Sequence, residues 1–335
     1  MAKNITMKDI ADKLGVSTVT VSKALTNREG VSDEVREKVK AKAEEMRYRY
    51  NSAAKAMKEG NNGNIGILIA NRFFEDNSFY NNLYRNIILK LTDTSFFGLL
   101  EIISQEQEEQ VRMPNVITNG KIDGLIIMGQ VSTEYLEEIK KTEIPFVFLD
   151  FYTELEEVES VNSDNIYGSY RLTNYLVQMG HREIAFIGNI NATSSIMDRY
   201  LGCLKSQLQH GLPHPPEWLI SDRDDKGKFL EYQLPEHMPT AFVCNCDQVA
   251  YQLINNLKSL GYRVPQDISV VGFDDYIYAT LADPQLTTFR VDMGQMASAS
   301  VLAIIKKIRN HKYVIGRKVI GGDVIVRDSV AKRSE

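Results

Sequence analysis

From Asn64 onward, short apolar runs alternate with stretches of helical spacing, and this alternation limits the possible folds more than any other feature. The runs are apolar at successive positions, as expected for strands of a parallel sheet covered by helices on both faces. About eight such units exceed one open sheet of usual size, so we expect two α/β lobes. The expected strands read IGILIA, LLEII, GLIIMG, FVFLD, IAFIG, AFVCN and ISVVGFDD, with intervening helices over 79–91, 106–119, 133–141, 165–179, 196–210 and 248–260.

Residues 5–50 have a different pattern, which predicts three short helices. Thr6 is suited to cap the first, with Asp9 three residues on as in a capping box, and Gly15 ends it. Ser17 caps a second helix from Thr18 to Leu25, and a third begins after Ser32. Two helices joined by a tight glycine turn, the second short and polar on one face, predict a helix-turn-helix. A generic αα-hairpin is the alternative.

Charge is distributed unevenly along the 335 residues. The net charge is −5, but residues 1–60 hold 13 Lys and Arg against 9 Asp and Glu, whereas the rest holds 26 against 35. A basic end on an acidic body is expected when only that end meets nucleic acid. Between the two parts, residues 51–63 pass from an Ala-rich helical segment to a Gly/Asn-rich break, which indicates a linker with one short helix.

Several classes of protein are disfavoured. No GxGxxG, GxxxxGK[ST], GxSxG or HExxH motif is present, so we expect no catalytic site, no cofactor and no enzyme activity. The lack of a long apolar run and of a signal peptide predicts a cytoplasmic protein with no membrane contact. Cys203, Cys244 and Cys246 are expected as reduced thiols. Cys244 and Cys246 would share one strand face, and without a further His or Cys nearby we expect no metal site.

Isolated polar residues follow several of the expected strands. In open parallel sheets, ligands bind beyond the carboxyl ends of the strands. Carboxylate, amide and guanidinium groups together can hold vicinal hydroxyls, which favours a sugar-like ligand and binding over catalysis. Taken singly, each residue could be only a helix cap or a turn residue. The candidates are Asp150, Arg199, Asn245, Asp247, Asp274 and Asp275.

Together these segments resemble the lac repressor/GalR family of transcriptional regulators from end to end. The resemblance rests on MKDIADKLGVSTVTVSKALTNREGVSDEVREKV, NSAAKAMKEG, NIGILI, GLIIMG, FVFLD, SDNIYG, GHREIAFIG, DRYLGC, CDQVAYQ, VPQDISVVGFDD, PQLTT and VIVRDS. It implies an all-α helix-turn-helix headpiece, a hinge helix, and an α/β core of two Rossmann-like lobes like that of periplasmic binding proteins. Three crossovers would join the lobes, near Val161–Ser163, Val291 and Ile320–Gly322.

The expected boundaries follow from this resemblance. The headpiece covers 1–50, the hinge helix and linker 51–63, and the effector-binding and dimerisation core 64–335. Within the core, the N-lobe takes 64–161 and 292–320, and the C-lobe takes 162–290 and 321–335. Because the chain has no leucine-heptad tail after VIVRDS, a homodimer is implied.

The resemblance also assigns residues to operator DNA. The helix from Thr18 would enter the major groove, with Thr18, Val19 and Lys23 contacting bases. Lys23 stands where family members more often carry Arg. A lysine ammonium cannot make the bidentate contact with a base that an arginine guanidinium makes. Positions expected to touch phosphate are Thr6, Ser17, Ser22 and Thr26.

The hinge departs more clearly from the family pattern. Tyr50-Asn51 replaces the usual Pro-Asn, and Met57 replaces the usual leucine that wedges into the minor groove. Met57 would insert at the centre of a near-palindromic operator, or else only pack against its dimer mate. The hinge residues assigned to the minor groove are Asn51, Ala54, Lys55 and Met57.

For the effector, the matching positions are Asp150, Arg199, Asp247 and Asp274, and Cys246 stands where Asn is common. Phe73, Phe74 and Phe79 follow the first core strand and would either stack on the ligand or belong to the core. The predicted function is therefore a sequence-specific repressor controlled by a sugar or sugar derivative. The alternative is a regulator gated mainly by a partner protein, with a degenerate effector pocket.

Overall fold

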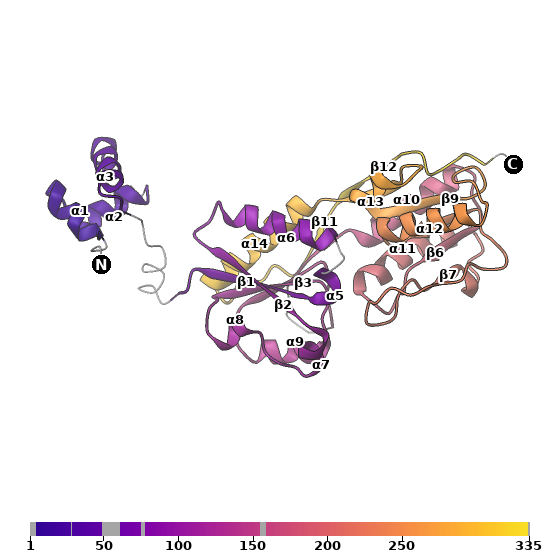
Figure 1. Ribbon diagram of the computed structural model, residues 1–335, viewed down its shortest axis with the longest axis horizontal. Coiled ribbons are helices and arrows are strands. Elements are labelled where there is room, and N and C mark those ends of the chain that lie inside the picture. Colours follow the sequence, from indigo (N-terminus) through magenta and orange to yellow (C-terminus); the bar gives the residue numbers. More distant parts are fainter. Residues whose placement is uncertain (1–4, 28, 49–60, 75–77, 155–158, 334–335) are drawn as a thin grey trace. The chain divides into compact units, whose positions relative to one another are not determined.

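The computed structural model describes residues 5–27, 29–48, 61–74, 78–154 and 159–333. The chain divides into two compact units, Met1–Asn62 and Gly63–Glu335, referred to below as the headpiece and the core (Figure 1). The hinge positions Asn51, Ala54, Lys55 and Met57 lie outside the described residues.

The described part of the headpiece contains three helices, and their ends confirm the predicted caps. In α1 (Met7–Leu14), Thr6 and Asp9 form a reciprocal capping box, and Gly15 ends the helix in the left-handed region at φ 65°. Ser17 caps α2 (Thr18–Leu25) by accepting the Thr20 N–H. Ser32 caps α3 (Asp33–Glu45) by accepting the Val35 N–H. The helices therefore start and stop where local sequence signals place them.

A small apolar cluster holds the three helices together. It consists of Ile10, Ala11, Val21, Ala24, Val39 and Ala43. Val21 and Ala24 bury one face of α2 in this cluster, whereas Val19, on the same helix, is 63% exposed. The helix-turn-helix is thus confirmed, and its second helix keeps one face open to solvent.

The core consists of two six-stranded sheets. The sheet of the N-lobe has the order β11-β5-β4-β3-β1-β2, and the sheet of the C-lobe has the order β12-β10-β9-β8-β6-β7. All pairings are parallel except that of β12 with β10. In the N-lobe β1 lies between β2 and β3, with Ile67 opposite Leu100 and Ile126. This is the predicted fold class of two parallel, helix-covered lobes.

The strand bounds show how the chain alternates between lobes. It passes from one sheet to the other after β5, after β10, and between β11 and β12. The N-lobe strands are β1 (Asn64–Ala70), β2 (Phe97–Ile103), β3 (Gly124–Met128), β4 (Phe146–Leu149), β5 (Ser160–Ser163) and β11 (Arg317–Ile320). The C-lobe strands are β6 (Ile184–Ile187), β7 (Leu219–Ile220), β8 (Ala241–Cys244), β9 (Ser269–Asp274), β10 (Thr287–Val291) and β12 (Gly322–Ile325).

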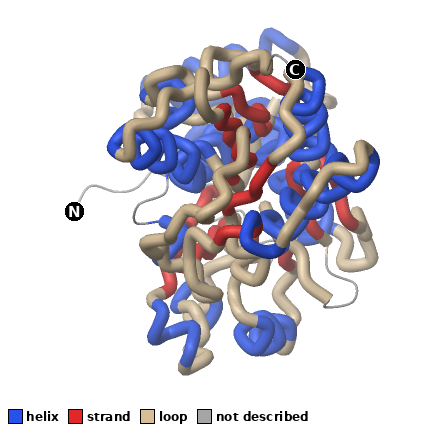
Figure 2. Tube along the Cα trace, turned by 90° about the vertical axis from the view of Figure 1, so that its right-hand side faces the viewer, coloured by secondary structure: helices blue, strands red, loops and turns tan. Residues whose placement is uncertain are grey.

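Helices cover both sheets, as the blue and red tubes of Figure 2 show for the core. Among the described residues, no helix is long and apolar enough to span a bilayer. The N-lobe holds α5 (Asn71–Phe74), α6 (Ser78–Leu91), α7 (Gln105–Glu109), α8 (Asn115–Thr118), α9 (Thr133–Lys140) and α14 (Met293–Arg309). The C-lobe holds α10 (Asn165–Gln178), α11 (Ser194–Gln209), the 3₁₀ turn η1 (Pro216–Trp218), α12 (Asp247–Ser259) and α13 (Ile277–Leu281).

One expected helix is wrong in detail. The stretch 106–119 forms two short helices, α7 and α8, rather than one. Val111 lies between them at a positive φ of 52°, and Pro114 precedes α8. Proline lacks a donor and disfavours helical backbone in the residue before it, so a continuous helix is interrupted there.

Candidate functional site

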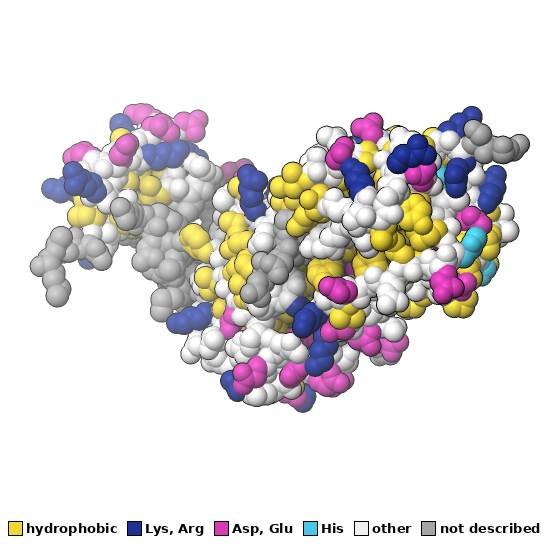
Figure 3. All heavy atoms as spheres, turned by 45° about the vertical axis from the view of Figure 1, so that its right-hand side comes forward, with side chains coloured by type: hydrophobic (Ala, Val, Ile, Leu, Met, Phe, Trp, Pro, Cys, Tyr) yellow, Lys and Arg dark blue, Asp and Glu magenta, His cyan; other side chains and the backbone are white. Residues whose placement is uncertain are grey.

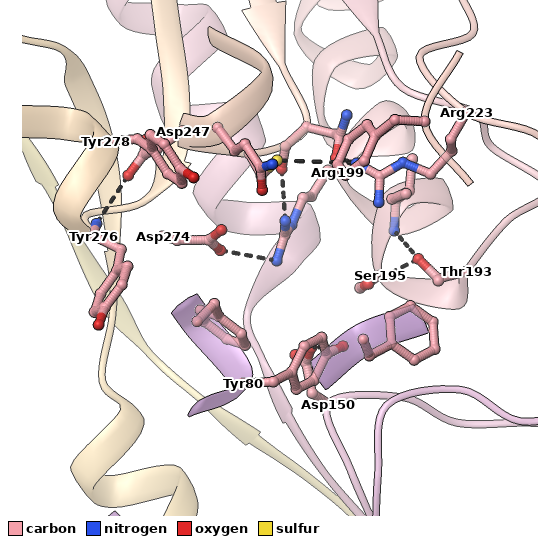
Figure 4. Close-up of a pocket in the computed structure, with 17 residues that line it drawn as sticks. Tyr80, Asp150, Thr193, Ser195, Arg199, Arg223, Asp247, Asp274, Tyr276 and Tyr278 are labelled. Carbon is pink, nitrogen blue, oxygen red and sulfur yellow. Dashed lines mark hydrogen bonds and ion pairs between the residues drawn. The ribbon is translucent and has the colours of Figure 1, made fainter. Parts of the chain in front are cut away.

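A cavity of about 60 Å³ lies between the two lobes of the core. Tyr80 and Asp150 face it from the N-lobe, and Arg199, Arg223 and Asp274 face it from the C-lobe (Figure 4). Its remaining lining residues are Phe73, Phe79, Thr193, Ser195, Ile196, Phe229, Asn245, Cys246, Asp247, Gln248, Tyr276 and Tyr278. The polar residues predicted at separate strand ends, with the exception of Asp275, therefore converge on one space.

Asp150 supplies the N-lobe carboxylate. It directly follows β4 and is only 3% exposed, with a left-handed backbone at φ 68°. Its Oδ2 accepts a 2.9 Å hydrogen bond from the Tyr80 hydroxyl. Within the described part of the chain, its Oδ1 has no hydrogen-bond partner. Burial raises the pKa of Asp150, although Arg199 and Tyr80 act in the opposite direction.

Asp274 supplies the corresponding carboxylate of the C-lobe, at the end of β9. Its backbone has φ 110°, where L residues are strained, and such strain is typical of binding sites. Its Oδ1 lies 3.4 Å from an Arg199 nitrogen but lacks hydrogen-bond geometry with any described group. Burial raises the pKa of Asp274 to about 7, although Arg199 lowers it. The group thus titrates near neutral pH.

Arg199 lies near the start of α11, and several neighbouring groups hold its side chain in place. Its Nε donates to Asn165 Oδ1 at 2.9 Å and its Nη1 donates to the Asn245 carbonyl at 2.6 Å. The guanidinium also stacks on Phe273, 4.0 Å from the ring centroid. Arg199 therefore fastens α11 to neighbouring elements as well as facing the cavity.

Asp247 and Cys246 lie at the start of α12. The two carboxylate oxygens of Asp247 accept from the Thr288 hydroxyl at 2.6 Å and the Tyr276 N–H at 2.9 Å. Burial raises the pKa of the Cys246 thiol to about 11. The expected shared face of Cys244 and Cys246 on one strand is wrong. Cys244 ends β8 inside the C-lobe core, whereas Cys246 is the N-cap residue before α12 and lines the cavity.

The aromatic residues predicted after the first strand have different environments. Phe73 and Phe79 line the cavity. Phe74 does not line it and packs edge-on against Tyr84, with ring centroids 6.4 Å apart. The expectation of a ligand contact at Phe74 is therefore not supported, because the short helix α5 turns consecutive side chains to different sides.

A hairpin of the C-lobe contributes cavity residues that the sequence did not reveal. Arg223 and Phe229 pair across its base, and the Arg223 guanidinium lies 4.5 Å from the Phe229 ring centroid. At its tip, the Lys226 ammonium lies 2.7 Å from Glu109 of the N-lobe. This segment follows the two-residue strand β7 and has no helical or alternating pattern. Its charged sequence, SDRDDKGKF, was the only available signal.

Other cavity residues were missed because their roles depend on distant partners. Thr193 caps α11 by accepting the Ile196 N–H, and its hydroxyl lies 3.0 Å from that of Ser195. Tyr80 is recognisable as the hydrogen-bond donor to Asp150 only in the folded structure, where the two chain segments lie side by side. Tyr276 and Tyr278 directly follow ISVVGFDD and could have been selected by proximity to Asp274.

The headpiece residues predicted to contact DNA lie on or beside α2. Thr6, Ser17, Thr18 and Val19 are exposed, whereas Ser22, Lys23 and Thr26 are half-buried. The hydroxyl of Thr26 donates to the Ser22 carbonyl at 2.7 Å, and Thr6 and Ser17 are engaged in helix caps. On the headpiece face drawn in Figure 3, basic and acidic side chains both occur, so this face is not uniformly basic.

Comparisons with known proteins agree with this architecture. The family of bacterial regulatory proteins of the lacI type matches residues 6–51, and the periplasmic binding protein-like domain matches residues 173–330. The HTH-type transcriptional regulator RegA of Clostridium saccharobutylicum is 33% identical over 343 residues, which cover 96% of this chain and 98% of RegA.

Two solved structures share the fold. The lac repressor dimer bound to operator and the anti-inducer ONPF has a TM-score of 0.75 at 22% identity, covering 98% of this chain and 100% of that one. The complex of the transcriptional regulator CelR with cellobiose has a TM-score of 0.70 at 22% identity, and the match covers 97% of this chain and 99% of the CelR chain. The family resemblance predicted from the sequence is confirmed: the chain belongs to the lacI family of bacterial regulatory proteins.

Proposed function

We propose that a small polyhydroxylated effector, a sugar or sugar derivative, binds between the lobes and changes the affinity of this repressor for operator DNA. The observation that carries the proposal is the pair of buried Oδ1 atoms of Asp150 and Asp274, which lack hydrogen-bond partners among the described residues. A buried carboxylate oxygen that lacks a hydrogen bond is costly, and ligand hydroxyls would supply one. The fold shared with the CelR–cellobiose complex supports the same location.

The position of the cavity indicates how binding could change the protein. Tyr80 and Asp150 line it from the N-lobe, and Arg199 and Asp274 line it from the C-lobe. A ligand that contacts both sets of residues favours the arrangement of the lobes in which it reaches them together. A ligand that binds one lobe arrangement better than another shifts the equilibrium between them.

Helix α11 offers a physical route between the effector and the N-lobe. Arg199 on this helix faces the cavity, and the preceding residue, Asp198, faces the N-lobe. The Asp198 carboxylate accepts from the Tyr152 hydroxyl at 2.6 Å and from Arg317 at 2.9 Å. A displacement of α11 by ligand would thus disturb a buried contact between the lobes.

For the DNA side, we retain the assignments made from the sequence. Val19 is 63% exposed, which suits an apolar contact with thymine methyl groups. Thr18 and Lys23 complete the proposed base contacts, with Thr6, Ser17, Ser22 and Thr26 on phosphates. The likeness to the operator-bound lac repressor dimer supports a homodimer and a near-palindromic operator. No observation favours the alternative of a partner-gated regulator with a degenerate pocket.

The test begins with selection of operator DNA from a random library by the full-length protein. We expect a near-palindrome, bound with a log–log salt slope of at least about −5. Operator affinity is then measured by fluorescence anisotropy with and without cellobiose, ribose and other small sugars. An affinity that changes at least about tenfold supports the proposal, and direct repeats or a flat salt response contradict it.

A further inference from the structure

We propose that the cavity between the lobes selects an uncharged polyhydroxyl ligand and excludes sugar phosphates and sugar acids. The inference rests on the proposed function, because it names the chemical class of the effector at the same site. It follows from which hydrogen-bonding groups of the cavity are already used and which are left open.

The two guanidinium groups of the cavity use part of their donors within the protein itself. Arg199 donates to Asn165 and to the Asn245 carbonyl, and faces Asp274. Arg223 donates from Nε and Nη2 to Asp222 Oδ2 at 2.9 and 2.7 Å, and Nη2 also donates to Asn245 Oδ1 at 3.2 Å. Recognition of a phosphate or carboxylate uses a guanidinium in a bidentate manner with free donors. A ligand anion would therefore compete with Asp222 for Arg223 and with Asp274 for Arg199.

The cavity also has open hydrogen-bond acceptors. Within the described residues, the Oδ1 atoms of Asp150 and Asp274 have no hydrogen-bond partner, and their side chains lie on opposite sides of the cavity in Figure 4. An ionised carboxylate only accepts hydrogen bonds. Such oxygens are matched by hydroxyl donors and repelled by the oxygens of a phosphate or a carboxylate.

Charge balance leads to the same result. The carboxylates of Asp150, Asp222, Asp247 and Asp274 are buried at or beside the cavity, against the guanidiniums of Arg199 and Arg223. Burial raises the pKa values of Asp150, Asp247 and Asp274, because their carboxylates are poorly solvated. A further anion in this poorly solvated space would be repelled by four carboxylates that share two guanidiniums.

The helix N-termini at the cavity do not restore an anion site. At α11, the Thr193 hydroxyl already accepts the Ile196 N–H. At α12, the first helical residue is Asp247, whose carboxylate adds a negative charge at the end that would otherwise favour an anion. One helix end is thus capped by the protein, and the other carries a carboxylate of its own.

The experiment uses matched ligands on the full-length protein at pH 7.5. Glucose, galactose and ribose are compared with glucose 6-phosphate, galactose 6-phosphate, ribose 5-phosphate, glucuronate and galacturonate, with cellobiose as a larger neutral probe. Operator affinity and melting temperature are both recorded. We expect only neutral ligands to alter either, with any matched anion at least about a hundredfold weaker.

The possible outcomes separate this inference from the proposed function. A phosphate or uronate that changes operator affinity more strongly than its neutral parent overturns the inference and leaves sugar-gated repression intact. A panel in which neither class changes operator affinity or melting temperature overturns both. A neutral ligand that acts alone supports both.

Paired variants show whether the two carboxylates cause the discrimination. In the double variant Asp150→Asn with Asp274→Asn, the negative charge is removed at nearly constant shape, so the ratio of anionic to neutral affinity should rise at least about tenfold. The matched control is Asp283→Asn, the same change at a side chain of the C-lobe that is 95% exposed. An unchanged ratio in the double variant, or an equal rise in the control, would show that these carboxylates do not exclude anions.

Discussion

The headpiece and the effector cavity differ in how their polar side chains find partners. In the headpiece, Thr6 pairs with Asp9 and Ser17 with Thr20, each three residues away. In the cavity, Tyr80 and Asp150 are 70 residues apart, and Arg199 bonds to groups 34 and 46 residues away. The headpiece surface is thus prepared by local structure, whereas the cavity exists only when both lobes are assembled. Changes in one unit should consequently leave the other nearly intact.

The largest expected effect is that of Ile10→Asp. Ile10 is fully buried in the headpiece cluster of six residues, and an unpaired carboxylate there should cost more than about 4 kcal/mol and unfold the headpiece. Operator binding measured by anisotropy should be lost, while the calorimetric transition of the core stays unchanged. Ile10→Val is the matched control, with a cost of about 0.5–1.5 kcal/mol. A core transition that falls together with the headpiece would contradict the separation.

Next in size is Arg199→Ala in the core. The change leaves the Asn165 oxygen, the Asn245 carbonyl and the Asp274 carboxylate without their cation, so the free energy of unfolding should fall by about 3–5 kcal/mol. Urea denaturation of the ligand-free core measures it. Asp274→Asn should destabilise far less, although both variants should weaken the effector response while their headpieces still bind operator. If Arg199→Ala and Asp274→Asn destabilised the core equally, the Arg199–Asp274 ion pair, rather than the other contacts of Arg199, would be what stabilises the C-lobe.

A smaller effect, confined to the headpiece, is expected for Lys23→Ala. Lys23 lies on the DNA-facing helix α2, and loss of a base contact costs about 1–3 kcal/mol. We expect relaxed preference at one symmetric pair of operator positions, measured by binding to single-substitution operators. Lys13→Ala, on α1, serves as a control for loss of one positive charge. Uniform weakening across all operators would identify Lys23 as a phosphate contact.

The cavity should also produce a pH dependence that the headpiece lacks. The pKa of Asp274 is about 7 in the folded protein, whereas its ordinary value is 3.8. At a pH between these two values, the folded state keeps a proton on Asp274 that the unfolded chain has released. This group's contribution therefore falls as pH rises from about 4 to 7, by at most about 1.4 kcal/mol per pH unit. Above pH 7 it should change no further.

Comparison with Asp274→Asn isolates this contribution. Subtracting the two stabilities is necessary because buried His181 also titrates in this range. Its pKa is lowered to about 4, so it destabilises the folded protein as pH falls below 6.5, whereas Asp274 stabilises it. The stability of Asp274→Asn relative to the parent should increase from pH 4 to pH 7, as measured by urea denaturation. The groups that act on Asp274 are Arg199, Asp150 and Arg223. A difference independent of pH would place the folded pKa of Asp274 near its ordinary value.

The smallest effect is expected for Ser17→Ala. Ser17 Oγ accepts the Thr20 N–H at 3.0 Å, and loss of such a cap costs about 1 kcal/mol. The headpiece transition should shift down by that amount, and Ser17→Asn should keep most of the stability because it retains a capping oxygen. A decrease of the same size in the core transition would show that the two units are coupled.

The sequence by itself determined the elements whose signals are local. The caps at Thr6, Ser17 and Ser32 were predictable because each acts on an N–H three residues along the chain. The apolar strands were predictable because burial on both faces imposes a continuous apolar run. Even the positions of Asp150 and Asp274 followed from the rule that ligands bind beyond the carboxyl ends of parallel strands. The family pattern added the pairing of headpiece with two-lobed core.

Only the tertiary structure decided what these residues can do. Both carboxylate oxygens of Asp247 accept hydrogen bonds, from Thr288 and Tyr276, which come from elsewhere in the C-lobe. One oxygen of Asp274 has no hydrogen-bond partner among the described residues. That Arg223 enters the cavity depends on a hairpin without periodicity, held by contacts to Asp222 and Asn245. Hydrogen bonds between distant segments leave no spacing in the sequence. The chemistry of the cavity, rich in open acceptors and with its arginines partly engaged, therefore emerges only when the lobes are folded.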